Sequence, residues 1–163
     1  MNAELTRQIE RWDRFRTGRT TALAADHGWL SLTSYRWLEP VPTKYDGVPG
    51  LWSASATSAT LTAVANDGIT LVSDSSHVSH VSNVDGTVEL SVAPEESVMW
   101  VQYGSVVVEL GVRAGRYMIR TRDSQSPVLD SFSGVPMFEF NPALVVQARF
   151  QAFESPRQVP IKT

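Results

Sequence analysis

The chain has 163 residues, of which 42% are apolar and 9% aromatic, with a formal net charge of -3 and no cysteine. This length and composition predict one soluble globular domain that buries its own core, and they exclude a disordered chain. The lack of cysteine excludes disulfides, thiol nucleophiles and cysteine-based zinc sites. The opening residues lack the apolar run of a secretory signal, and no stretch approaches the ~18 apolar residues of a membrane span. We therefore expect a cytoplasmic protein without a membrane partner.

The first part of the chain has the spacing of an amphipathic helix. Its apolar stripe consists of Leu5, Ile9, Trp12 and Phe15. This spacing predicts a helix over about residues 3–16, which Gly18 would end. We expect residues 1–18 to pack on the rest of the domain through Ile9, Trp12 and Phe15. A partner-binding or membrane-surface helix is the alternative, because five arginines against three acids give residues 1–19 a local charge of +2.

After residue 27 the apolar residues follow a period of two, which is typical of β-strands. The predicted strands cover residues 30–37, 61–64, 69–72, 88–92, 98–102, 106–112, 116–122, 137–140 and 145–153. Asn66-Asp67-Gly68 and Ala114-Gly115 have the residue types of hairpin turns, whereas residues 41–58 have the composition of a connecting loop. The sequence thus predicts a mainly β fold: an antiparallel β sandwich or partly open barrel over residues 28–153, with one N-terminal amphipathic helix. Residues 154–163, which include Pro156 and Pro160, would form an extended tail.

Residues that could carry catalysis are few. The only histidines are His27, His77 and His80, and no G-x-S-x-G motif or glycine-rich phosphate-binding motif occurs. The spacing of His77 and His80 would suit a metal on a helix, but on an extended chain the two rings point to opposite faces. We therefore expect no metal site and no cofactor, and loop or turn roles for the histidines. Net negative charge also argues against nucleic-acid binding.

Strand parity points to one chemically distinctive surface. In the predicted strand 116–122 the arginines share one face, while Tyr117 and Ile119 share the other, which goes to the core. Neighbouring strands would add Glu109 to the arginine-bearing face. The candidate ligand- or partner-binding residues are Arg113, Arg116, Arg120, Arg122 and Arg149. Five guanidinium groups with one nearby carboxylate favour a small anion or an acidic protein surface as partner. The alternative is a solvated sheet face with cross-strand ion pairs to Glu109 and Glu139.

Several segments resemble, in order, the motifs of a bacterial protein family catalogued as domain of unknown function 1684. They are Gly28 to Glu39, Gly115 to Asp123, Phe132 to Phe138, Asn141-Pro142-Ala143 and Ala148-Arg149-Phe150. Members of that family continue, after a segment like Val159-Pro160-Ile161, into a further β region with Asp-Phe-Asn, Pro-Pro-Cys and Cys-Pro motifs that do not occur here. The resemblance implies that this chain matches the N-terminal part of the family, to which no activity is attached.

Two hypotheses about function remain. The first is a non-enzymatic β module that binds a small anion, an acidic partner or its own missing C-terminal half through the arginine face. The second is a hydrolase-type enzyme that is active only in a longer chain, with the arginines orienting an anionic substrate. The sequence leaves open whether the protein is an enzyme.

Overall fold

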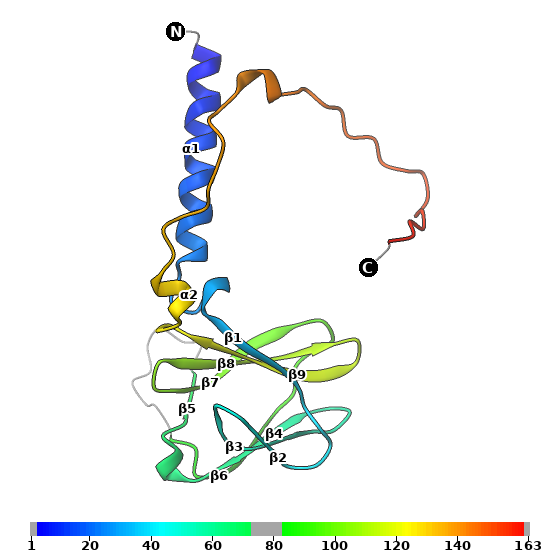
Figure 1. The fold of residues 1–163 in the computed structure, drawn as a ribbon. Helices are drawn as coiled ribbons and strands as arrows, with labels where there is room; N and C mark the ends of the chain where they lie inside the picture. The colour runs from blue at the N-terminus through cyan, green and yellow to red at the C-terminus, as the bar shows by residue number, and fades with distance from the viewer. Residues whose placement is uncertain (1–2, 73–82, 162–163) are drawn as a thin grey trace. The chain divides into compact units, whose positions relative to one another are not determined.

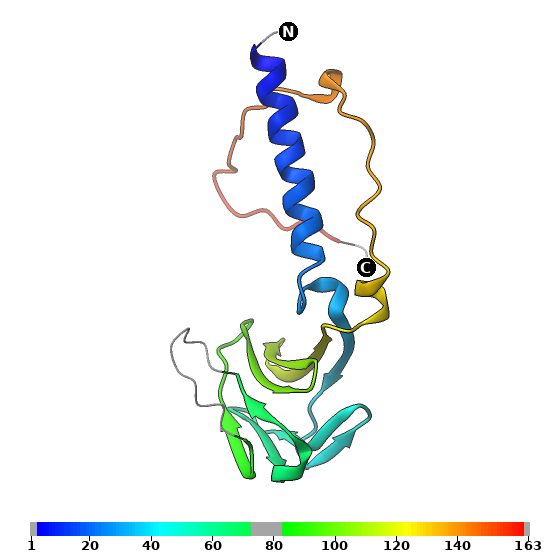
Figure 2. The ribbon, with the colours of Figure 1, turned by 90° about the vertical axis from the view of Figure 1, so that its left-hand side faces the viewer.

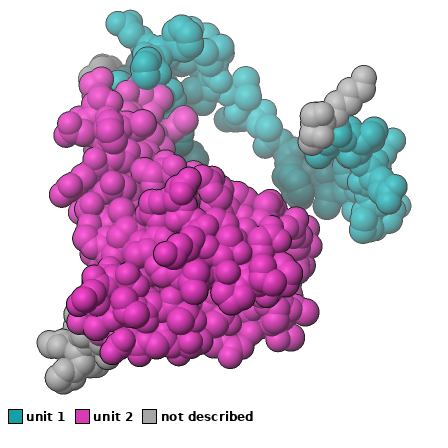
Figure 3. Space-filling view, turned by 60° about the horizontal axis from the view of Figure 1, so that its bottom comes forward, with its two compact units in different colours: residues 1–16, 136–163 teal, residues 17–135 magenta. Residues whose placement is uncertain are grey.

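A computed structural model describes residues 3–72 and 83–161 of the chain. The described residues contain two α-helices, α1 (Ala3–Leu23) and α2 (Pro127–Asp130). They also contain three 3₁₀ turns, η1 (Trp29–Ser31), η2 (Ala65–Asp67) and η3 (Pro142–Leu144). The strands are β1 (Leu32–Trp37), β2 (Thr43–Tyr45), β3 (Val48–Ala54), β4 (Ala59–Ala63), β5 (Thr70–Leu71), β6 (Gly86–Leu90), β7 (Ser97–Tyr103), β8 (Val106–Arg113) and β9 (Arg116–Asp123) (Figure 1). The chain divides into two compact units, residues 17–135 and residues 1–16 with 136–163 (Figure 3).

The strands form two antiparallel sheets in the unit of residues 17–135. The five-stranded sheet has the order β1-β9-β8-β7-β5, and the four-stranded sheet has the order β2-β3-β4-β6. One hydrophobic core takes side chains from both sheets, and in it Trp52 of β3 meets Trp100 of β7 edge to face, with ring centroids 5.6 Å apart. The two sheets therefore pack against each other (Figure 2). This confirms the predicted mainly β, antiparallel fold with one long N-terminal helix.

Side-chain alternation explains which face of each strand meets the core. In β4, Ala59, Leu61 and Ala63 are buried and the residues between them are not. In β9, Tyr117 and Ile119 belong to the core, as strand parity predicted. The predicted hairpin between β8 and β9 is also confirmed, because Ala114 and Gly115 adopt positive φ values of 49° and 72° at its turn.

Two predictions about turns and loops are wrong. The strands on either side of Asn66-Asp67-Gly68 do not pair, because β4 lies in one sheet and β5 in the other. Gly68, at φ 66°, ends the 3₁₀ turn η2, and the chain then crosses to the other sheet with Ile69 fully buried. Residues 41–58 are not a loop either, since they contain β3, which pairs with β4, and β2, which pairs with β3. The Pro, Gly and Ser residues of this segment favoured a loop in the sequence, although β3 places Trp52 in the core.

The N-terminal helix is longer than predicted. It passes through Gly18 and ends at Leu23. A glycine in an exposed helix costs only about 1 kcal/mol relative to alanine, which does not by itself end a helix. The boundary predicted at residue 18 is therefore wrong. Whether residues 1–18 pack on the β domain stays a prediction.

The two C-terminal strands predicted at residues 137–140 and 145–153 are also wrong, so the last strand ends at Asp123 rather than near residue 153. Within their own unit, Phe140 lies 6.4 Å from Trp12 between ring centroids, and Trp12 stacks on Phe15 at 6.1 Å. Gln8, Arg11, Trp12, Phe15, Phe140 and Val145 line an apolar cavity of about 300 Å³. Residues 154–161 contain no helix or strand and are exposed.

Candidate functional site

The arginines of β9 lie on the face of the five-stranded sheet that points away from the core. Register brings Tyr35 of β1 and Glu109 of β8 opposite Arg120, and it brings Arg113 opposite Arg116. We call this surface the arginine–aromatic face. It consists of Trp29, Tyr35, Trp37, Glu109, Arg113, Arg116, Met118, Arg120 and Arg122.

Glu109 holds two of these arginines. Its Oε2 accepts hydrogen bonds from Nε and Nη2 of Arg122 at 2.9 and 2.7 Å, and its Oε1 accepts one from Nη1 of Arg120 at 3.2 Å. The side chains of Glu109 and Arg122 are each only 8% exposed, so this is a buried ion pair in which two N–H groups of Arg122 share one carboxylate oxygen. The cross-strand ion pairs to Glu109 that the sequence offered as the alternative therefore form with Arg120 and Arg122. Glu139, the other acid considered, lies in the other unit.

The pKa of Glu109 is lowered. Burial alone would raise it, but hydrogen bonds from Arg122 and Ser97 and the charges of Arg122 and Arg120 together outweigh the burial. A carboxyl group with a depressed pKa stabilises the folded state above its unfolded pKa, and this contribution is lost as the pH falls through the folded value. Glu109 therefore ties the stability of the sheet to a charged carboxylate.

Each of the three arginines on β9 also lies over an aromatic ring. Arg122 is 5.6 Å from the ring centroid of Trp29, Arg120 is 5.5 Å from Tyr35, and Arg116 is 4.7 Å from Trp37. Arg122 Nη1 further donates to the Gly28 carbonyl at 2.8 Å, which fixes the turn that carries Trp29. The result is a row of cation–π contacts along one edge of the sheet. Trp29 remains 65% exposed.

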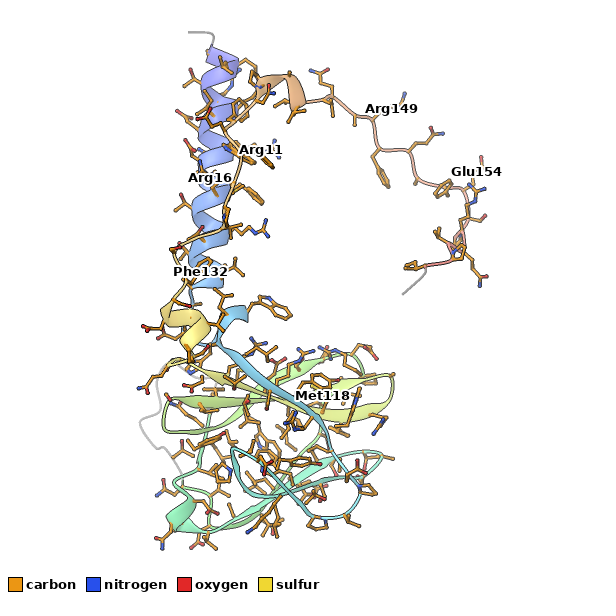
Figure 4. The ribbon with its side chains drawn as sticks, viewed as in Figure 1. Arg11, Arg16, Met118, Phe132, Arg149 and Glu154 are labelled. Carbon is orange, nitrogen blue, oxygen red and sulfur yellow. The ribbon has the colours of Figure 1, made fainter. Side chains whose placement is uncertain are left out.

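Met118 shows how tightly this face is covered. Its position on β9 points away from the core, yet it is fully buried (Figure 4). Its register neighbours are Trp37 and Gly111, and a Cβ at Gly111 would overlap the Met118 methyl group. Glycine at 111 therefore makes room for Met118 beneath the arginine and aromatic side chains.

Arg113 and Arg116 mark the open end of the face. Arg116 is exposed, and its ring contact with Trp37 is its only side-chain interaction with the described residues. Arg113 donates from Nη1 to the carbonyls of Glu96 and Val112 and from Nη2 to Ser97 Oγ. Within the part of the chain that the structure describes, neither guanidinium forms an ion pair. Neither charge is therefore balanced by a carboxylate among the described residues, and the Arg116 guanidinium is also free of hydrogen bonds to them.

The fifth predicted residue, Arg149, is not carried by a strand of the five-stranded sheet. It lies in the unit of residues 1–16 and 136–163, in a segment without a strand, and is exposed (Figure 4). The prediction that it extends the sheet face is wrong, because its predicted strand does not form. The binding roles of all five arginines stay predictions.

The remaining residues considered as candidates are the three histidines. His27 Nε2 lies 3.1 Å from the Ser105 carbonyl oxygen at a turn. His77 and His80 fall outside the described residues. Among residues 3–72 and 83–161, no group of three or more His, Asp or Glu side chains is placed to hold a metal ion. None of the helices described there is long and apolar enough to cross a membrane.

The sequence missed the aromatic half of the site. Trp29, Tyr35 and Trp37 lie in the first strand region, and the arginines follow some 80 residues later. The parity of Tyr35 and Trp37 was readable, but the pairing of β1 with β9 is a long-range contact that no local pattern specifies.

Comparison with known proteins adds no assignment: no family model, no curated protein and no solved structure matches this chain. The resemblance to the family of unknown function 1684 therefore rests on the sequence motifs alone and stays a prediction.

Proposed function

We propose that the chain is a binding module whose arginine–aromatic face engages an acidic protein surface. The observation that carries this proposal is Arg116, an exposed guanidinium that is stacked on Trp37 and forms no ion pair with the described residues. The stacking orients the guanidinium while leaving its N–H groups free for a carboxylate. We further propose, as the sequence predicted, that the protein is bacterial and cytoplasmic.

The roles of the arginines follow from their partners. Arg120 and Arg122 share the single carboxylate of Glu109, which leaves these three residues with one net positive charge, and they hold β8, β9 and the Trp29 turn together. Arg116 and Arg113, opposite each other at the hairpin end, add two further positive charges. Tyrosine, tryptophan and arginine are the residues most often found at the energetic centres of protein interfaces. A mixed aromatic and cationic surface therefore suits a protein partner that presents carboxylates.

A titration with a short oligoglutamate peptide tests the proposal. We expect saturable binding that weakens as salt rises, because salt screens contacts between exposed charges. Arg116→Gln should weaken binding about tenfold, as expected for one charge-assisted hydrogen bond. Arg14→Gln and Arg19→Gln, each of which removes an exposed arginine of α1, are the matched controls and should change binding little.

Equal losses in Arg116→Gln and in both controls would show that only net charge matters and would contradict the proposal. Inorganic phosphate separates the remaining possibility. If phosphate saturates the site and competes fully with the peptide, the partner is a small anion rather than a protein surface. Melting temperatures of the three variants should match the wild type, which excludes unfolding as the cause.

A further inference from the structure

Residues 145–153 have the side-chain pattern of a strand but pair with no strand among residues 3–72 and 83–161. Their apolar side chains, Val146, Ala148, Phe150 and Ala152, alternate with Gln147, Arg149 and Gln151. Val146 is 79% exposed and Phe150 is 90% exposed. Within the described chain, the backbone of residues 146–161 forms no hydrogen bond. An extended segment with open backbone groups and one apolar face is suited to join the edge of a sheet.

The described sheets offer four edge strands, and they differ in how well they fit such a segment. β5 has two residues, and β2 has three with Lys44 at its centre. β1 carries Arg36, which would repel Arg149 on an added strand. β6 is different, because its residues alternate in the same way as residues 145–153.

The parity of β6 is fixed by its pairing with β4. Val88 lies opposite the buried Leu61, and Leu90 lies opposite the buried Ala59, so both face the core. They are nevertheless only partly buried. Glu89 and Thr87 point to the other face and are exposed. The core is therefore incompletely covered at this edge, and the outer face there is acidic.

We infer that Val145–Phe153 is a donor strand that adds to the β6 edge of a second copy of this chain. Val146 and Phe150 would extend the core beside Val88 and Leu90. On the outer face Arg149 would pair with Glu89. Both the apolar and the charged complements thus lie within one sequence, so a second copy of this chain offers everything that the donor strand needs.

The number of donor strands and acceptor edges in each copy supports a dimer. Each copy carries one donor and one acceptor edge, so a two-fold exchange satisfies both and leaves neither open. Each donor inserts one phenylalanine, one valine and two alanines, and an aromatic side chain alone buries about 150 to 250 Å². Counted over both copies and both surfaces, the exchange reaches on the order of 1,600 Å², which is a standard stable interface.

Engineered cysteines test the pairing directly, because the native chain has none. Glu89→Cys and Arg149→Cys are made as separate variants, mixed and oxidised, with Gln147→Cys and Gln151→Cys to scan the register. We expect a disulfide-linked heterodimer that forms only in the mixture and peaks at one donor position, since only cross-strand neighbours meet disulfide geometry. A doubly substituted chain that closes its own disulfide as a monomer would show that the segment folds back, and would overturn the inference.

A second test measures the dimerisation of the unmodified chain and of a matched pair of variants by light scattering. Phe150→Asp should weaken dimerisation more than tenfold, because it places a charge in the extended core. Gln151→Asp adds the same charge on the polar face and should weaken it far less. Arg149→Glu and Glu89→Arg should each weaken the dimer, and the double substitution should restore it. A chain that stays monomeric at all concentrations, or charge reversals that do not rescue each other, would contradict the inference.

Discussion

β8 and the segment of residues 145–153 both carry an apolar residue at every second position, yet one is buried and the other is exposed. Residues Val107 to Val112 of β8 are all buried, because β7 and β9 pair with it on both sides and the two faces are covered. In the later segment Val146 is 79% and Phe150 90% exposed, and none of the strands in the described part of the chain pairs with it. The difference teaches that an alternating pattern specifies a strand-competent face, whereas a strand also needs an edge to pair with.

The largest loss of stability is expected at Glu109, which lies on β8 between β7 and β9. Glu109→Ala leaves Arg122 buried and Arg120 nearly so without their carboxylate. Removing one partner of a buried ion pair costs about 3 to 5 kcal/mol. Chemical denaturation at neutral pH measures this loss. A change below about 1 kcal/mol would show that the pair is solvated rather than buried.

The same carboxylate gives a pH dependence. Since the pKa of folded Glu109 is depressed, the free energy of unfolding of the wild type should fall as the pH drops from the ordinary glutamate range through the lower folded value. Glu109→Gln should be less stable at neutral pH and should lose less on acidification. Parallel acid curves for wild type and Glu109→Gln would argue against this origin of the acid sensitivity.

A matched valine pair tests the comparison itself. Val108 is fully buried, whereas Val146 is 79% exposed. Val108→Ala should cost about 2 kcal/mol, from the transfer of two methyl groups and the cavity left behind. Val146→Ala should change the unfolding free energy of the monomer by less than about 0.5 kcal/mol. Equal losses at the two positions would mean that residues 145–153 are packed in solution.

The sequence predicted local features well and long-range pairing poorly. It predicted the hairpin at Ala114-Gly115, the inward side of β9 and the apolar stripe of α1, because each depends on neighbours in the chain. It missed β2 and β3, placed a hairpin at Gly68 and added two C-terminal strands, because these depend on which distant edge a segment meets. For the candidate site, parity placed the three arginines of β9 and Glu109 on one face, but it could not show that Glu109 would bind Arg120 and Arg122 in a buried pair.

A smaller effect is expected at Tyr117, which ties the core to a loop. Its hydroxyl donates to the Thr57 carbonyl at 2.7 Å and accepts from the Val92 amide at 3.3 Å. Tyr117→Phe keeps the buried ring but leaves both backbone groups unpaired, so we expect a loss of about 1 to 3 kcal/mol. Thermal denaturation measures it, with Tyr35→Phe as a control for a tyrosine on the outer face. An unchanged melting temperature would show that water replaces the hydroxyl at no cost.

The smallest effect is expected from deleting residues 154–163. The described part of this segment, residues 154–161, forms no hydrogen bond, and its one aromatic contact is that of Arg157 with Phe153, at 5.6 Å from the ring centroid. An exposed cation–π contact contributes only about 0.5 to 1 kcal/mol, and this one lies outside the paired sheets. The melting temperature of the β region should therefore stay the same. The deletion also leaves Val145–Phe153 intact, so the mixture of Glu89→Cys and Arg149→Cys chains should still form its disulfide. Loss of that cross-link together with an unchanged melting temperature would extend the donor strand past Phe153, because residues that contribute nothing to the monomer would then be needed for its pairing.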